Sequence, residues 1–267
     1  MILITNNVDY HYEIIVHIIE KYDIILSIPK QDVCLECKPN PSFLKYIREK
    51  YPNVRLEVPP TYDYLINCTI YPQDIIDIAI NKYYISHRVF ETLNPNIFFL
   101  TPLKFPYLCC DALPFKDEKI KNPMPIYIVQ GNVDDGRKKY ELLDQILAQK
   151  YDHDFRIKII GRGKMHPRFH QSDKIIFRHN LDFIDYHKEF LDGYAILPLI
   201  TKSSHPQYYT KQLPSSINYG LAYNLHFIID EDLQNIFQLE NASVFKDDIV
   251  SAFKKSLDDF YKKKRFH

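Results

Sequence analysis

The segment IYIVQGNVDDGRKK, residues 126–139, contains the pattern that decides the fold. A mostly apolar run at 126–130 is followed directly by Gly131, and a helical pattern begins near Lys138. A short apolar run between turn signals is typical of a buried strand, and glycine permits a sharp turn after it. A strand, a glycine turn and a helix in this order predict a β-α-β unit and a parallel sheet.

The same alternation extends in both directions along the chain. On the C-terminal side we expect strands at 156–160, 174–177, 194–199 and 226–229 and helices at 138–149, 183–190, 215–224 and 249–261. On the N-terminal side we expect strands at 2–5, 23–27, 54–58, 64–68, 82–86 and 97–100 and helices at 10–21, 42–50 and 73–80. Residues 111–125 are charged, proline-rich and without periodicity, which predicts a linker. The sequence therefore predicts an α/β protein of two Rossmann-like domains, 1–118 and 119–267.

Composition excludes several classes of function. The chain has 267 residues, no net charge and 46% hydrophobic residues, which does not favour a general binder of nucleic acid or anionic membranes. It contains no apolar stretch long enough for a transmembrane segment and no signal-type N-terminus, so we expect a cytoplasmic protein. Cys34 and Cys37 form a lone CxxC among five cysteines, so we expect no zinc site and reduced thiols.

The glycines are concentrated in one part of the chain. All six lie between Gly131 and Gly220, and Gly131, Gly161 and Gly163 follow the first two strands predicted for the second domain. The carboxyl ends of parallel strands are where such sheets bind ligands. Their clustering predicts close approach of a ligand to the backbone at this edge.

A helix start in TKQLPSSINYGLAYNLHFIID, residues 210–230, offers a second candidate site. Lys211 precedes a helix entered through Ser215 and Ser216. Serine before a helix is most often an N-cap, whereas the free N–H groups and positive dipole of a helix start also suit phosphate. We expect the two serines to cap the helix and to contact phosphate in the same geometry.

Four ordered blocks of the second half resemble the donor-binding domain of GT-B glycosyltransferases. They are IYIVQGNVDDGRKK, RIKIIGRG, KIIFRHNLDFIDYHKEFLDGYAILPLI and KQLPSSINYGLAYNLHFIID, spread over residues 125–260. The resemblance implies two Rossmann-like domains facing a cleft, a nucleoside-diphosphate sugar as donor, and a hydroxyl acceptor on a glycan or glycoprotein. It also implies that no metal or other cofactor is bound. The donor contacts it implies are Gly131, Asn132, Arg137, Lys138, Gly161, Gly163, Lys211, Ser215 and Ser216.

The chain departs from the family pattern in the last of these blocks. Many retaining members carry a glutamate in this helix, whereas this chain has Asn218 and Tyr219 there, so we expect an inverting enzyme. Asn224 stands where glycine is usual, and asparagine also tolerates the left-handed conformation. An inverting reaction needs a base for the acceptor hydroxyl, and the candidates that follow strands of the first half are Asp9, His11 and His87.

Other interpretations remain. Asp152-His153-Asp154 spells a metal-binding motif of a different glycosyltransferase fold, but it precedes its predicted strand, so we interpret it as a solvated turn. A nucleotide- or sugar-binding protein without turnover is the main alternative. A dinucleotide-dependent oxidoreductase is disfavoured because NNVDYH, after the first strand, contains no glycine. The composition, rich in Ile, Lys, Asn and Tyr, is typical of an AT-rich genome, and such short sugar-transfer enzymes occur in large DNA viruses.

Overall fold

The computed structural model describes most of the chain, and the chain divides into two compact units. The described residues are 2–6, 12–21, 26–27, 41–56, 63–68, 82–86, 95–100, 102–103, 115, 118–133, 136, 138–164, 166–169 and 172–264. The first unit comprises Met1–Pro114, Asp182–Ile184 and Thr210–Leu213, and the second comprises Phe115–Leu181, Asp185–Tyr209 and Pro214–His267.

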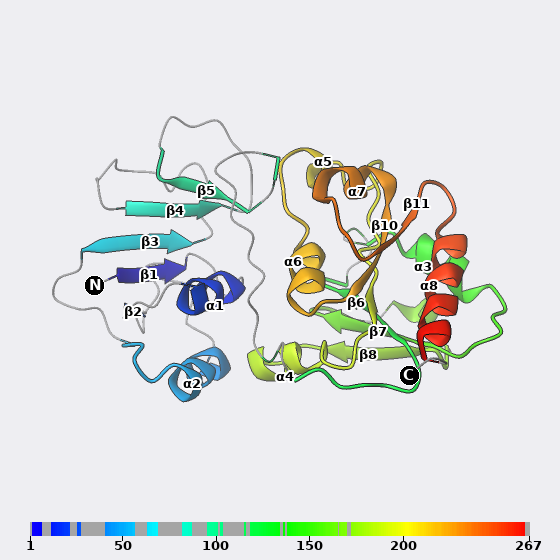
Figure 1. Ribbon diagram of the computed structural model, residues 1–267, viewed down its shortest axis with the longest axis horizontal. Helices are drawn as coiled ribbons and strands as arrows, with labels where there is room; N and C mark the ends of the chain where they lie inside the picture. Colours follow the sequence, from blue (N-terminus) through cyan, green and yellow to red (C-terminus); the bar gives the residue numbers. More distant parts are fainter. Residues whose placement is uncertain are drawn as a thin grey trace. The chain divides into compact units, whose positions relative to one another are not determined.

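Within the described residues, the first unit contains a parallel five-stranded sheet in the order β2-β1-β3-β4-β5 (Figure 1). Its elements are β1 (Ile2–Asn6), α1 (Tyr12–Lys21), β2 (Leu26–Ser27), α2 (Pro41–Lys50), β3 (Tyr64–Cys68), β4 (Lys82–Ser86) and β5 (Ile97–Phe99). In this order the direction of winding reverses between β1 and β3, which makes their carboxyl ends the switch point where such sheets bind ligands.

Aromatic packing joins the helices of the first unit. The ring of Tyr12 on α1 stacks on Phe43 of α2 with centroids 4.2 Å apart, and both rings meet the edge of Phe183. Ile14, Ile15 and Ile18 form the buried stripe of α1, as its periodicity predicts.

In the described part of the second unit, a parallel six-stranded sheet has the order β11-β10-β9-β6-β7-β8. Its strands are β6 (Ile126–Gln130), β7 (Arg156–Gly161), β8 (Ile175–His179), β9 (Ala195–Ile196), β10 (His226–Asp230) and β11 (Ala242–Phe245). The helices after β6 are α3 (Tyr140–Leu147), η3 (Pro167–Phe169), α4 (Phe183–Lys188), α5 (Gln207–Thr210), α6 (Ser215–Ala222), α7 (Glu231–Phe237) and α8 (Ile249–Lys264). They belong to the second unit except for the first two residues of α4 and the last residue of α5, which group with the first unit. This is the doubly wound order 3-2-1-4-5-6 of dinucleotide-binding folds, with its switch point between β6 and β9.

Helices cover both faces of the second sheet. On one face Tyr127 and Ile157 pack with Leu143 of α3 and Phe253 of α8. On the other face α6 lies so close to the sheet that a Cβ atom on Gly220 would be 2.3 Å from the Phe227 ring. In Figure 1, α8 (red) and α6 (orange) lie on opposite sides of the strands. The predicted α/β class with two Rossmann-like units is therefore confirmed.

The structure corrects several predicted elements. Residues 54–56 belong to no strand of the sheet, and 57–58 lie outside the described residues, as does the predicted helix at 73–80. α5, α7 and β11 were not predicted, and α3 begins at Tyr140, two residues later than expected. No helix in the described part of the chain is long and apolar enough to cross a membrane.

Candidate functional site at the carboxyl ends of β6 and β9

Two glycine turns touch at the carboxyl ends of β6 and β7. Gly131 has a φ of +121°, a conformation that side chains disfavour. A Cβ atom on Gly161 would lie 1.6 Å from the carbonyl oxygen of Gly131, so only glycine fits at position 161. The Gly131 N–H donates to the carbonyl of Ile160 at 3.0 Å, which ties the turn to β7. The turns at Gly131 and Gly161 therefore form a backbone surface beside the switch point that neither glycine covers with a side chain, here called the glycine platform.

Lys138 brings a positive charge to this platform. A Cβ atom on Gly131 would be 3.6 Å from the Lys138 Nζ, and that Nζ donates to the carbonyl oxygen of Pro198, beyond β9, at 3.2 Å. Burial lowers the pKa of Lys138 to about 8, because desolvation disfavours the charged ammonium. The ammonium group thus bridges the ends of β6 and β9, and an anion placed beside it would restore its pKa.

The amino end of α6 faces the same place, but its serines do not cap it. The N-cap residue is Pro214, which makes no side-chain cap bond, so the predicted capping role of Ser215 and Ser216 is wrong. Proline has a fixed φ and lacks an N–H, and it places Ser215 as the first helical residue. Ser215 Oγ instead donates to Gln130 Oε1 at 3.1 Å, and Ser216 is buried. The Ile217 N–H donates to the carbonyl of the N-cap residue Pro214 at 3.0 Å, which leaves the N–H groups of Ser215 and Ser216 as those that precede any intrahelical acceptor and suit an anion.

Gln130 and Tyr186 are members of the site that the sequence did not reveal. Gln130 is the last residue of β6 and is 5% exposed, and its Nε2 donates to the hydroxyl of Tyr186, on α4, at 2.7 Å. A polar residue ending an otherwise apolar strand, directly before a glycine turn, is a signal that could have identified Gln130. Tyr186 carries no such signal because the chain has 21 tyrosines.

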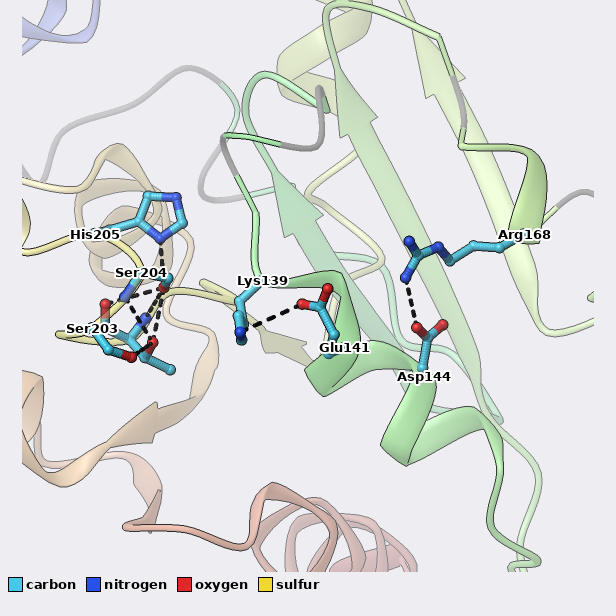
Figure 2. Close-up of polar contacts among 8 residues, drawn as sticks. Lys139, Glu141, Asp144, Arg168, Ser203, Ser204 and His205 are labelled. Carbon is cyan, nitrogen blue, oxygen red and sulfur yellow. Dashed lines mark hydrogen bonds and ion pairs between the residues drawn. The ribbon is translucent and has the colours of Figure 1, made fainter.

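The loop after β9 is held by hydroxyl groups, as Figure 2 shows. Ser204 Oγ lies 2.8 Å from Thr201 Oγ1 and 2.8 Å from Nδ1 of the buried His205. The Lys139 N–H donates to the carbonyl of Leu199 at 2.7 Å, and Leu199 adopts a left-handed φ of 52°. A non-glycine residue in this conformation costs free energy, so the surrounding hydrogen bonds hold the loop in a strained position at the switch point.

A shallow cavity of about 450 Å³ opens further along the same edge, beyond β9, β10 and β11. It is lined by Thr201, Lys202, Ser203, Asp230, Asp232 and Lys246. Asp230 accepts a hydrogen bond from the hydroxyl of Tyr209 and caps α7 by accepting from Leu233 N at 3.0 Å. Burial raises the pKa of the Asp230 carboxyl group. These bonds occupy both carboxylate oxygens, so Asp230 mainly stabilises this wall.

The structure brings together only some of the predicted donor residues. Gly131, Gly161, Lys138 and Ser215 lie around the switch point. Asn132 is exposed, and Gly163 has a φ of +111° in the loop that continues past Gly161. Lys211 is exposed and belongs to the segment Thr210–Leu213, which groups with the first unit. The predicted residues Asp9, His11, His87 and Arg137 lie outside the described residues.

The described residues contain no group of three or more His, Cys, Asp or Glu side chains that could hold a metal ion. Asp152, His153 and Asp154 lie in the loop between α3 and β7, at the amino end of that strand. The His153 ring stacks on Tyr261 with centroids 4.2 Å apart, and Asp154 pairs with Lys174 at 3.6 Å. This segment is remote along the strand from the glycine platform at its carboxyl end.

Comparison with known proteins finds similar architectures and no family. No family model matches the chain, and no curated protein matches it. A DNA-modifying β-glucosyltransferase, studied with and without its substrate uridine diphosphoglucose, is 10% identical with a TM-score of 0.43, covering 98% of this chain and 90% of its own. The calicheamicin glycosyltransferase CalG4 is 8% identical with a TM-score of 0.43, covering 97% and 89%. A protein described as a UDP-N-acetylglucosamine 2-epimerase from Listeria monocytogenes is 10% identical with a TM-score of 0.48, covering 98% and 88%. Because each TM-score lies below 0.5, these similarities do not by themselves indicate a function for this chain.

Proposed function

We propose that the chain is a glycosyltransferase that moves a sugar from a nucleoside-diphosphate sugar to a hydroxyl group of a glycan or glycoprotein acceptor. One observation carries the proposal. The Lys138 ammonium, the bare Gly131 turn and the amino end of α6 converge at the switch point between β6 and β9. An ammonium group, open backbone and a helix N-terminus together are suited to a diphosphate.

The same groups supply the chemistry that sugar transfer needs. The acceptor oxygen bonds to the anomeric carbon while the bond from that carbon to the diphosphate oxygen breaks. Negative charge grows on the departing diphosphate, and groups fixed around it stabilise the transition state more than the ground state. Lys138 and the first N–H groups of α6 supply this positive potential, so we propose a reaction that needs no metal ion.

The acceptor must lose its hydroxyl proton to a base. We propose that the base is one of Asp9, His11 and His87, which follow β1 and β4 in the sequence. β1 is one of the two strands at the switch point of the first sheet, where doubly wound sheets bind ligands. A base opposite the leaving diphosphate inverts the configuration at the anomeric carbon. The absence of an acid on α6, where Asn218 and Tyr219 are buried, fits this assignment.

Thermal denaturation in the presence of nucleoside diphosphates tests the site. A ligand that binds the folded chain raises its melting temperature, so one of UDP, GDP, ADP and CDP should do so. Lys138→Met should weaken that ligand by about 10- to 100-fold, since a hydrogen bond to a charged group contributes roughly 1.5–3 kcal/mol. Lys139→Met is the matched control, because the Lys139 side chain pairs with Glu141 at 3.8 Å instead (Figure 2).

A second measurement separates an enzyme from a binding protein of the same fold. Slow release of free sugar from the matching nucleotide sugar, lost in Lys138→Met, would support turnover. Tight nucleotide binding without hydrolysis or transfer would favour the non-catalytic alternative. If none of the nucleoside diphosphates changes the melting temperature, the proposed function is wrong.

A further inference from the structure

Resting on the proposed function, we propose that Gln130 is a positioning residue that aims the hydroxyl proton of Ser215 at the bound diphosphate. Gln130 lies between two hydroxyl groups, and its side-chain amide is in contact with both. Its Oε1 is 3.1 Å from Ser215 Oγ, at the first residue of α6, and its Nε2 is 2.7 Å from the Tyr186 hydroxyl, on α4.

Counting protons shows why the direction of these bonds matters. A serine hydroxyl has one proton to donate, and an amide has a donor end and an acceptor end. In the structure Ser215 gives its proton to Gln130, and Gln130 gives one to Tyr186. In this arrangement Ser215 presents only lone pairs to a ligand. Lone pairs facing a phosphate oxygen repel it, so this arrangement does not favour an anion.

Rotating the Gln130 side-chain amide by half a turn reverses the direction of both hydrogen bonds without moving the two hydroxyl oxygens. Tyr186 then donates to Gln130 Oε1, Gln130 Nε2 donates to Ser215 Oγ, and the Ser215 proton is released toward the amino end of α6. Both arrangements satisfy both ends of the amide, so the change leaves neither end of the Gln130 side chain unpaired. An anion beside Ser215 selects the second arrangement, because only there does it gain a hydrogen bond.

The burial of Gln130 keeps its amide bonded to the two hydroxyl groups and not to water. Gln130 is 5% exposed, and its neighbours on β6 are buried throughout the strand, so water competes little for either end of the amide. A buried polar group that loses its partner pays a desolvation cost, which keeps the amide bonded to both hydroxyls in either arrangement. Gln130 therefore couples the state of Tyr186 to the state of Ser215.

A double-mutant cycle on pyrophosphate binding tests the coupling. Pyrophosphate contains the part of the donor that the site would hold and avoids assuming a base. By calorimetry, Ser215→Ala should raise its Kd about ten-fold, a loss typical of one hydrogen bond to a charged ligand. Gln130→Met should raise it by less, about five-fold, because the Ser215 hydroxyl remains but is no longer oriented toward the ligand. In the Ser215→Ala background, Gln130→Met should then raise Kd by less than about two-fold, because the shared contact is already gone. Gln130→Glu should weaken binding more than Gln130→Met, since a carboxylate only accepts and also repels the ligand.

A spectroscopic readout distinguishes positioning from a merely structural role. In the ¹⁵N-labelled full chain, the Gln130 side-chain NH₂ signals should shift on addition of pyrophosphate and stay unchanged in Ser215→Ala. Tyr223→Phe is the control, because it removes a hydroxyl 2.9 Å from buried His187 on the same pair of helices. It should lower the melting temperature and leave Kd unchanged.

The outcomes separate this inference from the proposed function. If neither pyrophosphate nor any nucleoside diphosphate binds the unmodified chain, both are wrong. If pyrophosphate binds and the effects of Gln130→Met and Ser215→Ala multiply, only the role of Gln130 is overturned. Should Gln130→Met not fold, Tyr186→Phe replaces it, with an expected rise in Kd of about three-fold that disappears in the Ser215→Ala background.

Discussion

The Cβ position of Gly161 lies 1.6 Å from the carbonyl oxygen of Gly131, so the turns after β6 and β7 meet backbone to backbone. Any side chain at 161 must push the two turns apart. Because the Gly131 turn also lies against Lys138, such a displacement would move the ammonium group as well. Stability and ligand binding are therefore linked at this pair of glycines.

Gly161→Ala should destabilise the chain by about 3 kcal/mol, the upper part of the range for overpacking, and should weaken nucleotide binding. Gly136→Ala is the control, since a Cβ atom there meets nothing within 4 Å. Urea denaturation of both variants, followed by thermal shifts with nucleoside diphosphates, measures the two effects. Equal stability of the two variants would contradict the close contact.

The affinity for a diphosphate should fall as the pH rises above 8. The pKa of Lys138 is lowered to about 8 by burial, so the free protein loses this proton above that pH. A bound anion restores the pKa, so binding takes up a proton, and affinity should fall about ten-fold per pH unit above 8. Calorimetry in buffers of different ionisation enthalpy measures the uptake. Lys138→Met should show neither the uptake nor the pH dependence above 8.

The same residue affects stability with the opposite sign. Its pKa is lower in the folded chain than its ordinary value of 10.5, so the unfolded chain holds more protons between pH 8 and 10.5. The contribution of Lys138 to the free energy of unfolding therefore rises with pH across this window. Comparing urea denaturation of the unmodified chain and Lys138→Met at pH 7.5 and 10 isolates this contribution. If the free energy of unfolding of the unmodified chain, relative to that of Lys138→Met, were instead larger at pH 7.5 than at pH 10, the pKa of Lys138 would be raised and not lowered in the folded chain.

Lys158→Met should destabilise the chain by about 3 kcal/mol, the lower part of the range for breaking a buried ion pair, because it removes the buried cation between two partly buried carboxylates. Lys158 is 5% exposed in the middle of β7, and its Nζ lies 2.8 Å from Glu189 Oε2 and 2.6 Å from Asp192 Oδ1. Adding Glu189→Gln and Asp192→Asn to the variant should recover most of the loss. Lys45→Met, in an exposed pair with Glu49, is the control and should change the melting temperature little. A loss equal to that of Lys45→Met would show that the cluster is solvated.

Lys211→Ala should lower kcat/KM for the nucleotide sugar about ten-fold or more and leave the melting temperature unchanged. An exposed lysine contributes little to folding, whereas a contact to the leaving phosphate strengthens as charge develops. Lys254→Ala, at an exposed position on α8, serves as the control. Normal turnover combined with a large fall in melting temperature would give Lys211 a structural role instead.

Turnover should survive EDTA, because Lys138 and the α6 N–H groups supply positive charge without a metal. The described residues offer no cluster of three metal-ligating side chains to replace them. Activity assays after chelation, with and without added Mn²⁺, measure this directly. Loss with EDTA and recovery with Mn²⁺ would overturn the metal-free mechanism.

The strongly periodic parts of the fold could be predicted from the sequence. The bounds of β6 agree residue for residue, because an apolar run ending at a glycine is a clear signal. α7 was missed because its N-cap, Asp230, is also the last residue of β10, so no loop separates strand from helix. β11 was missed because it has four residues, and one of them is the buried polar Ser243.

The site was harder to predict than the fold. The glycine platform follows from composition and spacing, and Asn224 does adopt the left-handed φ expected of it, at 47°. The environment of Lys138 could not be predicted, since its ammonium donates to the carbonyl oxygen of Pro198, sixty residues further along the chain. The roles of Ser215 and Gln130 likewise depend on a contact between two elements that are 85 positions apart.

Lys119, in the segment leading into the second sheet, reaches the other end of the α6 helix. Its Nζ donates to the carbonyl oxygens of Asn224 at 3.1 Å and Tyr223 at 3.5 Å, where the negative end of the helix dipole lies. A cation at the carboxyl end of α6 and a diphosphate at its amino end would each have the sign of charge that the helix dipole favours there. We therefore expect the partial charges at both ends of α6 to be compensated together only when a diphosphate is bound at its amino end. Proteolytic cleavage beside Lys119 should then weaken its contacts with the carboxyl end of α6 and lower the stability of the helix, although the cut lies far from Ser215 in the sequence.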